Sequence, residues 1–407
     1  MWRLDLDRKN GWSCKGALET MTEMHRLSIV CMTLCLACIG CSSTNGALSN
    51  VEEVHAVISD TGVGDIEIVR ILSNIRKESG VPAMAAALLT SKGLRKVGAV
   101  GTRKWGADIP VSLDDLWHLG SDTKIMTSTL AALLVEQGKI KWTTTVSEVF
   151  PDIADSFNPE VKGITILQLL SHMAGIPDNV GFDTFSTSIP VREQRIEALK
   201  IALSAKLQSS PGTEFFYSNL GYVIAGAMIE RVLDMDWEMA VTKYIFKPLQ
   251  MSSAGFGGLG TVGMIDQPWG HESSKKPFDK NGPDADNPPV MGPAGRVHST
   301  IQDWALFITD QLRGAQGKQG ILSNEDYQML QSSHFGGEYG LGWQVVQREW
   351  AGGKALTHMG SNTIFLSLVW IAPAKDFAIL VCTNEGLDSF GAADEAITKL
   401  IPLAASL

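Results

Sequence analysis

The sequence predicts an α+β fold in which an antiparallel sheet is flanked by N- and C-terminal helices and interrupted by a mainly helical insertion. Two observations lead to this prediction. Strand-like runs gather near the two ends of the chain, at residues 82–101 and again around residues 340–383. Residues from about 145 to 335 instead alternate helical patterns with loops. We therefore expect the sheet to form from both ends of the chain, with a functional site where it meets the insertion.

The elements at the two ends are predicted from their residue patterns. After a predicted linker at residues 42–64, a helix is expected near residues 65–78, followed by strands at residues 82–89 and 94–101. The last predicted helix covers residues 392–403. Because 44% of the chain is hydrophobic, residues 65–407 can form one domain with a large core.

Ser121 and Lys124 form a Ser-x-x-Lys motif at the predicted start of a buried helix. The residues that follow are apolar nearly all round, up to a predicted capping glycine at Gly138. Residues three apart share a helix face, so the lysine amine would lie beside the serine hydroxyl. Burial disfavours a charged lysine, and a neutral amine can accept the serine proton. The alternative is a helix cap followed by a solvated lysine, as expected for the second Ser-x-x-Lys at residues 273–276, which has no helix to hold it.

A second motif, Tyr217-Ser218-Asn219, places a phenol and a carboxamide just ahead of a predicted helix at residues 223–233. Tyr217 could move a proton between the nucleophile and the leaving group. Asn219 could hold a substrate amide or orient Lys124. The alternative is a packed tyrosine beside a capping asparagine.

A third motif begins at His358 and precedes a predicted strand at residues 364–371. Gly360 would let a substrate backbone approach closely. We expect His358 to bind the far side of the substrate, and the backbone N–H of Ser361 to join that of Ser121 as an oxyanion hole. The alternative is a half-exposed histidine on a strand.

Together the three motifs resemble those of the serine β-lactamase and penicillin-binding superfamily. The similar branch holds class C β-lactamases, D-Ala-D-Ala carboxypeptidases, D-aminopeptidases and family VIII esterases. The resemblance runs from about residue 66 to residue 403. It implies catalysis and substrate binding by the motif residues, which are Ser121, Lys124 and Tyr217 for catalysis and Asn219, His358, Gly360 and Ser361 for binding.

Two departures from the family pattern bear on the substrate. A β-lactamase of this branch usually has Lys-Thr-Gly in the third motif, where this chain has His358-Met359-Gly360. That difference favours a peptidase or an esterase. Arg296 stands where the pattern usually has a small residue, and it could narrow the cleft, pair with a substrate carboxylate or lie exposed on a loop.

The motifs lead to the hypothesis of a serine hydrolase that forms an acyl-enzyme on Ser121 and hydrolyses small esters or peptide and amide bonds. Two alternatives stay open. One is a β-lactamase, and the other is a non-catalytic penicillin-recognising protein that is acylated once or not at all. The candidate substrates are therefore short esters, D-amino-acid peptides and β-lactams.

An export signal is predicted at residues 1–41, of which residues 1–23 are interpreted as an over-extended gene start. Residues 27–40 form a 14-residue apolar run, which is short for a membrane span and typical of a signal peptide. Cys41 follows this run in a context that resembles a bacterial lipoprotein cleavage site. A lipid on Cys41 would anchor an exported protein to a membrane, and plain secretion is the alternative.

Composition argues against several other functions. The net charge of −10 is unfavourable for a nucleic-acid partner. No serine has glycine both two residues before and two residues after it, which excludes an α/β-hydrolase elbow. No zincin or P-loop pattern occurs, so no metal or other cofactor is implied. Five of the six cysteines lie within residues 1–41, which leaves Cys382 without a disulfide partner in the predicted domain.

Overall fold

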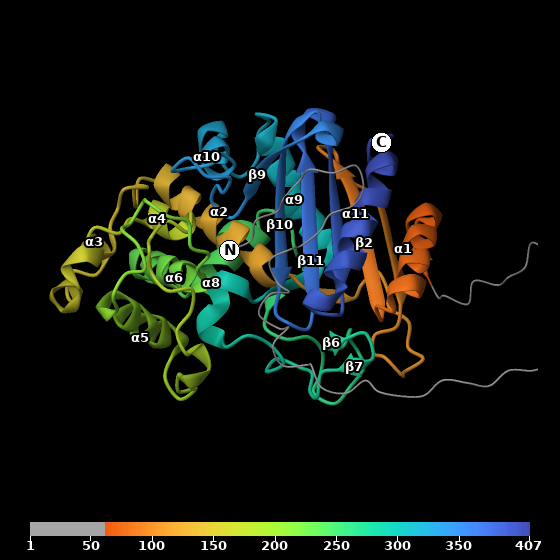
Figure 1. Ribbon diagram of the computed structural model, residues 1–407, viewed down its shortest axis with the longest axis horizontal. Coiled ribbons are helices and arrows are strands. Elements are labelled where there is room, and N and C mark those ends of the chain that lie inside the picture. Colours follow the sequence, from red (N-terminus) through yellow and green to blue (C-terminus); the bar gives the residue numbers. More distant parts are fainter. Residues whose placement is uncertain (1–61) are drawn as a thin grey trace, which may run out of the picture. The chain divides into compact units, whose positions relative to one another are not determined.

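A seven-stranded antiparallel sheet is the main feature of the computed structural model, which describes residues 62–407 (Figure 1). Its strand order is β1-β3-β2-β12-β11-β10-β9, and every neighbouring pair is antiparallel. The strands, in that order, are Val63–Gly64, Gly93–Gly101, Ala83–Thr90, Phe377–Thr383, Leu366–Ala372, Gly353–Ser361 and Gln344–Arg348. The two ends of the chain thus build one sheet, and the predicted α+β fold class is confirmed.

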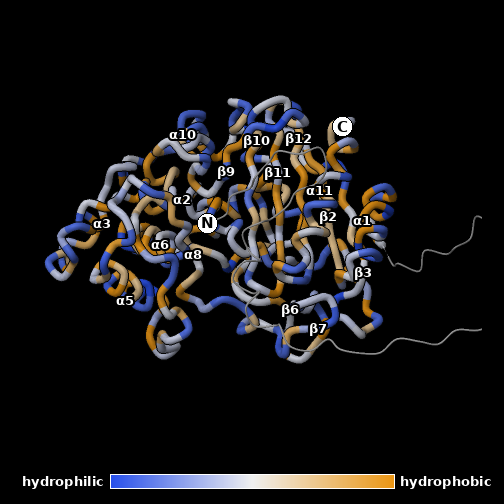
Figure 2. The backbone as a smooth tube through the Cα atoms, viewed as in Figure 1, coloured by the Kyte–Doolittle hydropathy of each residue, from blue (hydrophilic) through white to orange (hydrophobic). Residues whose placement is uncertain are grey.

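Both faces of the central strands are covered, which explains their nearly continuous hydrophobic sequences. Every residue of β2, β11 and β12 is buried, and these strands are mostly hydrophobic in Figure 2. Successive residues of a strand point to opposite faces. Alternate residues of β2, such as Ala83 and Ala85, join the large core that includes α9 (Ile301–Ala315). Helices α1 (Ile66–Ser79) and α11 (Phe390–Ala404) pack against each other and against the sheet.

Helix α1 has defined caps at both ends. The Asp65 side chain accepts hydrogen bonds from the backbone N–H groups of Glu67 and Ile68, which lack partners inside the helix. Gly80 ends the helix with a positive φ of 79°, a conformation that glycine adopts without steric cost. These caps fix the helix close to its predicted bounds.

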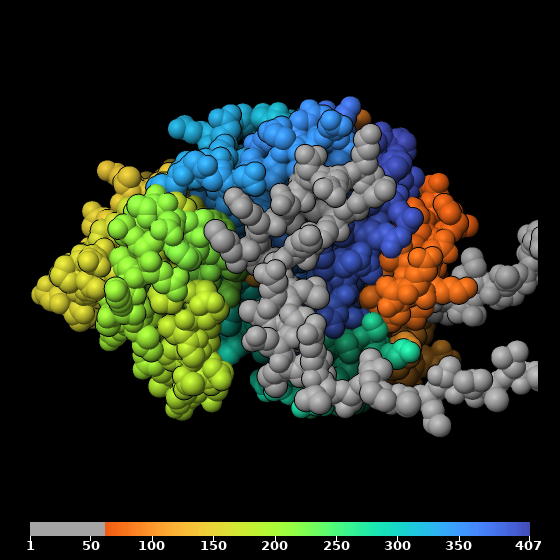
Figure 3. Space-filling model, in the orientation of Figure 1, coloured from red at the N-terminus to blue at the C-terminus, as the bar shows by residue number. Residues whose placement is uncertain are grey.

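Most helices lie between β3 and β9 in the sequence. Figure 3 shows the yellow and green residues of this part of the chain beside blue residues of the C-terminal part on one surface. Its α-helices are α2 (Thr123–Glu136), α3 (Val146–Val149), α4 (Ile166–Leu170), α5 (Val191–Ser204), α6 (Asn219–Leu233), α7 (Trp237–Val241), α8 (Gly292–Gly295), α9 and α10 (Asn324–Leu330), and one of its several 3₁₀ helices is η1 (Gly120–Asp122), directly before α2. Its short strands are β4 (Leu116–His118), β5 (Gly255–Phe256), β6 (His271–Ser273), β7 (Lys276–Pro277) and β8 (Val297–Thr300).

Helix α2 is buried on almost every side because it packs against α6, α8 and α10. The turn η1, which precedes α2, packs against β10 and β11 of the sheet. The start of α2 therefore lies where the sheet meets the helical region, which is where a site was expected.

Within residues 62–407, no helix combines the length and the apolar character needed to cross a membrane. The predicted export signal and Cys41 lie outside the residues that the structure describes.

Candidate active site

Ser121 lies in the 3₁₀ turn η1, and α2 begins two residues later, at Thr123. A Cβ atom added to Gly120 would lie 2.3 Å from the backbone nitrogen of Ser361, and one added to Gly360 would lie 2.8 Å from that of Ser121. Both distances are too short for any side chain. The two glycines thus let the turn and β10 touch through their backbones, which brings the amides of Ser121 and Ser361 to the same junction.

Lys124 is fully buried on the first turn of α2. Its Nζ lies 3.0 Å from Ser121 Oγ, 2.7 Å from Asn219 Oδ1 and 2.7 Å from the carbonyl oxygen of Ala294. Burial lowers the pKa of Lys124 well below its usual value, although nearby Asp122 acts in the opposite direction. A neutral amine has two N–H groups, which match the two carbonyl oxygens, and one lone pair, which is left for the hydroxyl of Ser121.

Tyr217 lies beside this amine, with its ring centre 4.9 Å from Lys124 Nζ. Burial raises the pKa of Tyr217, and a hydrogen bond with Ser121 opposes that rise only partly. The phenol is therefore uncharged at neutral pH, and it can pass a proton on but does not provide a standing phenolate.

The Tyr-Ser-Asn motif is held by residues far away in the sequence. Asn219 Nδ2 donates to Asn179 Oδ1 at 3.0 Å, which leaves its Oδ1 directed to Lys124. Ser218 caps α6 by accepting from the backbone N–H of Gly221. Since Ser218 is the cap, the structure does not support the alternative of a capping asparagine.

His172 supports the same motif and was not singled out from the sequence. Its Nδ1 accepts from the backbone N–H of Ser218 at 3.0 Å, and its ring centre lies 4.4 Å from that of Tyr217. Burial lowers the pKa of His172 well below its usual value, so the imidazole is neutral. Its positive φ of 61° is uncommon for a residue other than glycine.

His358 lies on β10, and both nitrogens of its ring contact protein groups. Nδ1 lies 2.9 Å from Asp122 Oδ1, and Nε2 lies 3.1 Å from the hydroxyl of Tyr339. The side chain is buried, unlike the half-exposed strand histidine of the alternative hypothesis. A substrate group could reach a ring nitrogen only by displacing one of these two partners.

Arg296 is paired inside the protein. Its Nε donates to the buried Asp286 at 3.2 Å, and only 12% of its side chain is exposed. His118 Nε2 and Asn362 Nδ2 lie 2.8 and 3.0 Å from the other oxygen of Asp286. Burial acts to raise the pKa of Asp286, but His118 and Arg296 hold it below its usual value. Because His118 Nδ1 also accepts from the backbone N–H of Gly120, this cluster supports the nucleophile turn.

The second Ser-x-x-Lys has a different environment. Ser273 and Lys276 belong to the short strands β6 and β7, and the exposed Lys276 pairs with Glu272. No helix places this lysine beside a serine hydroxyl.

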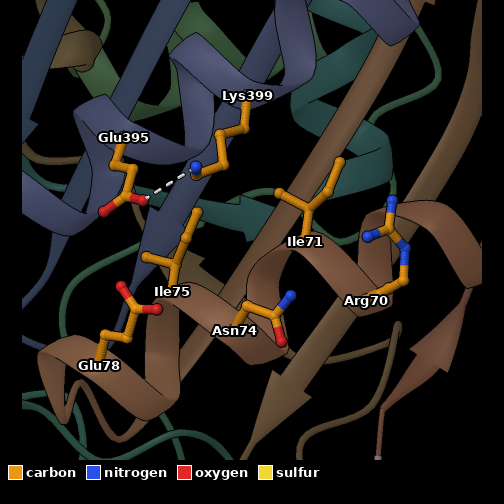
Figure 4. A pocket seen from close by; sticks show the side chains of 7 residues that line it. All are labelled: Arg70, Ile71, Asn74, Ile75, Glu78, Glu395 and Lys399. Carbon is orange, nitrogen blue, oxygen red and sulfur yellow. Dashed lines mark ion pairs between the residues drawn. The ribbon is translucent and has the colours of Figure 1, made fainter.

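A surface cavity of about 390 Å³ lies between α1 and α11 and contains no residue of the three motifs (Figure 4). Two of its charged side chains, Glu395 and Lys399, form an ion pair of 3.5 Å across one turn of α11. The helix surfaces that line it carry no serine, threonine or cysteine, so this cavity does not fit an acyl-transfer site. The residues that line it are Arg70, Ile71, Asn74, Ile75, Glu78, Glu395 and Lys399.

Comparisons with known proteins identify the family and the fold of this chain. The chain is 24% identical over 331 residues to "Penicillin-binding protein 4" of Amycolatopsis lactamdurans, which covers 77% of this chain and 83% of that protein. It is also 24% identical over 279 residues to "Protein flp" of Staphylococcus aureus strain MW2, covering 66% of this chain. Those residues are 52% of Protein flp, so the match spans about half of that relative.

A solved structure, that of the octameric penicillin-binding protein homologue from Pyrococcus abyssi, has the same fold. Its TM-score is 0.66 at 22% identity, over 83% of this chain and 77% of that chain. The family model described as Beta-lactamase matches residues 68–401. Since this match includes all strands of the sheet except β1, the helical region and all three motifs, the chain belongs to the Beta-lactamase family of the serine β-lactamase and penicillin-binding superfamily.

Proposed function

We propose that the protein is a serine hydrolase that cleaves small esters or peptide and amide bonds through an acyl-enzyme on Ser121. The observation that carries this proposal is the environment of Lys124. Its amine is buried, contacts two carbonyl oxygens and lies 3.0 Å from Ser121 Oγ. A neutral amine in this position is a general base for the serine.

Acylation would proceed in two steps. As Ser121 Oγ bonds to the substrate carbonyl carbon, its proton passes to Lys124 Nζ and the carbonyl oxygen becomes an oxyanion. The backbone N–H groups of Ser121 and Ser361 would donate to this oxygen, and one such donor is typically worth about 3 kcal/mol. The bond to the leaving group then breaks, and the proton moves from Lys124 through Tyr217 to the leaving atom.

Deacylation reverses these roles with water in place of the leaving group. Tyr217 passes a proton from the water to Lys124 as the water oxygen attacks the acyl carbon. The bond to Ser121 Oγ then breaks, and the serine recovers a proton while the acid is released. Asn219 would keep Lys124 in place throughout, because its Oδ1 accepts from the amine.

A turnover panel tests this proposal. Short esters, D-amino-acid peptides and a penicillin would be supplied to the purified protein, with intact-mass detection of the acyl-enzyme. Turnover of an ester or peptide with a transient adduct supports the proposal. Preferential penicillin turnover would favour the β-lactamase alternative. A stable adduct without turnover would favour a non-catalytic penicillin-recognising protein. The absence of both an adduct and turnover would refute the proposal.

Replacing Tyr217 by phenylalanine should lower kcat by about 10² to 10⁴ while the protein stays folded, because it removes one proton-transfer group and little packing. The measurement is steady-state kinetics on the best substrate of the panel, with thermal unfolding as a check. Tyr244→Phe is a matched control, because Tyr244 is also partly buried and belongs to none of the motifs. If kcat of Tyr217→Phe instead stays within about threefold of the wild-type value, Tyr217 has a packing role only.

We also propose that the protein is exported and anchored through a lipid on Cys41. When it is expressed in a Gram-negative host with its own leader, it should fractionate with membranes, and Cys41→Ser should release it. Cys38→Ser is the control, because Cys38 lies in the same segment three residues earlier. If the wild type and both variants are all found in the soluble fraction, plain secretion is the correct interpretation.

A further inference from the structure

Asp122 occupies one of the two variable positions of the Ser-x-x-Lys motif, yet its side chain is fully buried and bonded at both oxygens. Oδ1 lies 2.9 Å from His358 Nδ1, and Oδ2 accepts from Ser367 Oγ at 2.6 Å. A carboxylate oxygen accepts, so Nδ1 carries the proton. In the neutral imidazole Nε2 is then free to accept from the hydroxyl of Tyr339, at 3.1 Å.

These bonds connect the nucleophile turn to two strands. Asp122 belongs to η1, whereas His358 lies on β10 and Ser367 lies on the neighbouring strand β11. Strand β10 also carries Gly360 and Ser361, whose backbone touches the turn. The carboxylate therefore connects the turn that carries the Ser121 amide to the strand that carries the Ser361 amide.

The buried carboxylate needs these partners. Burial raises the pKa of Asp122, and the interactions with His358, Ser367 and Lys124 oppose this effect. Removing one partner of a buried hydrogen bond leaves the other partner unsatisfied, which lowers the stability of the folded protein by about 1–3 kcal/mol. Replacing both partners by apolar groups can be nearly neutral.

The same bonds limit what His358 can offer a substrate. Its two ring nitrogens are used by Asp122 and Tyr339, and any positive charge on the ring would be compensated by the adjacent carboxylate. The other nearby basic side chains are also engaged, because the amine of Lys124 has three contacts and the guanidinium of Arg296 pairs with Asp286. No free side-chain charge of these residues is left for a substrate carboxylate.

We propose that Asp122 and His358 act as a positioning pair that holds the nucleophile turn against β10, and that the third motif binds substrate through its backbone rather than through the imidazole. This inference rests on the proposed acyl transfer at Ser121. It replaces the expectation that the His358 side chain is a substrate ligand.

A double-mutant cycle tests the pair, using Asp122→Leu, His358→Leu and the double variant. Each single variant should lower kcat by about tenfold or more with KM changed less than about threefold, because the pair would act after substrate binding. The double variant should be no slower than the slower single variant, since the pair acts as a unit. Asp122→Asn should retain kcat within about threefold, because the amide can accept from His358 and donate to Ser367.

Asp310→Leu is the matched control. Asp310 is also buried, and it accepts from Tyr327 and from the backbone of Ile321, outside the three motifs. This variant should lose thermal stability while its kcat and KM stay near those of wild type. If Asp122→Leu behaves in the same way, the positioning role is refuted.

A matched pair of esters, one with a carboxylate on the leaving group and one without, tests the role of the imidazole. The ratio of kcat/KM for the two esters should stay within about threefold in His358→Leu. A loss of tenfold or more for the carboxylate ester alone, expressed in KM, would restore His358 as a substrate ligand. If the wild type turns over neither ester nor any other substrate of the panel, the proposed hydrolase function is refuted. The thermal stabilities of the two single variants and the double variant would then decide whether Asp122 and His358 are coupled.

Discussion

Replacing Ser121 with alanine is expected to lower kcat by at least about 10⁴-fold and to abolish covalent labelling by a phosphonate or a penicillin. The reason is that the proposed reaction needs a nucleophile that bonds to the substrate, and an alanine side chain has no atom that can form this bond. Ser121 Oγ lies 3.0 Å from the buried amine of Lys124. The measurement is turnover of the best substrate, combined with mass mapping of the labelled peptide.

Ser273→Ala is the control for this prediction, because Ser273 begins the second Ser-x-x-Lys. Its lysine, Lys276, is exposed and paired with Glu272, so this variant should be labelled and should turn over like the wild type. Labelling that persists in Ser121→Ala and maps to Ser273 or Ser274 would show that the wrong copy of the motif has been assigned.

The sequence was sufficient to predict the fold class, because buried strands have a recognisable composition. Strands such as β2 and β12 are apolar throughout, since both of their faces are covered. Their positions at opposite ends of the chain also predicted a sheet with an insertion. The bounds of the elements were predicted less well, because local turns decide them. Helix α6, for example, begins at Asn219 and not at residue 223, since Ser218 provides the cap.

The relation between Ser121 and Lys124 could be expected from helix geometry, because residues three apart lie on one face. The partners of the lysine could not be derived in this way. Asn219 and the carbonyl oxygen of Ala294 come from positions 95 and 170 residues away. The resemblance of the second motif suggested Asn219, but a backbone carbonyl has no signature in the sequence.

The role of Asp122 illustrates the same limit. It stands at a position where the motif accepts any residue, and its partner His358 is 236 residues away. A carboxylate inside an apolar helix start is the only local signal, because such a group must find a partner when it is buried. Arg296 is similar, since nothing in the local sequence indicates that it pairs with the buried Asp286, ten residues earlier.

Replacing Lys124 with methionine is the second change with a large expected effect, a loss of about 10² to 10⁴ in kcat. Methionine has a similar length and fills the same buried space, but it cannot accept the proton of Ser121. Lys354→Met is the control, because burial also lowers the pKa of Lys354, which lies on β10 outside the third motif. The double variant Ser121→Ala/Lys124→Met should be no slower than Ser121→Ala, because the two residues act in the same step.

The pH profile of the wild type tests why Lys124 can be a base. The reaction needs the neutral amine, so kcat/KM should fall as pH drops through the pKa of Lys124 and level off above it. An ordinary lysine, with a pKa near 10.4, would give a rise of about tenfold per pH unit up to about pH 10. Because burial lowers the pKa of Lys124 well below that value, kcat/KM should change less than about twofold between pH 9 and 10. The raised pKa of Tyr217 keeps a phenolate from contributing in this range. A steady tenfold rise to pH 10, after correction for uncatalysed hydrolysis, would show that the base titrates as an exposed lysine or as a phenol, and that the buried amine is not the group that activates Ser121.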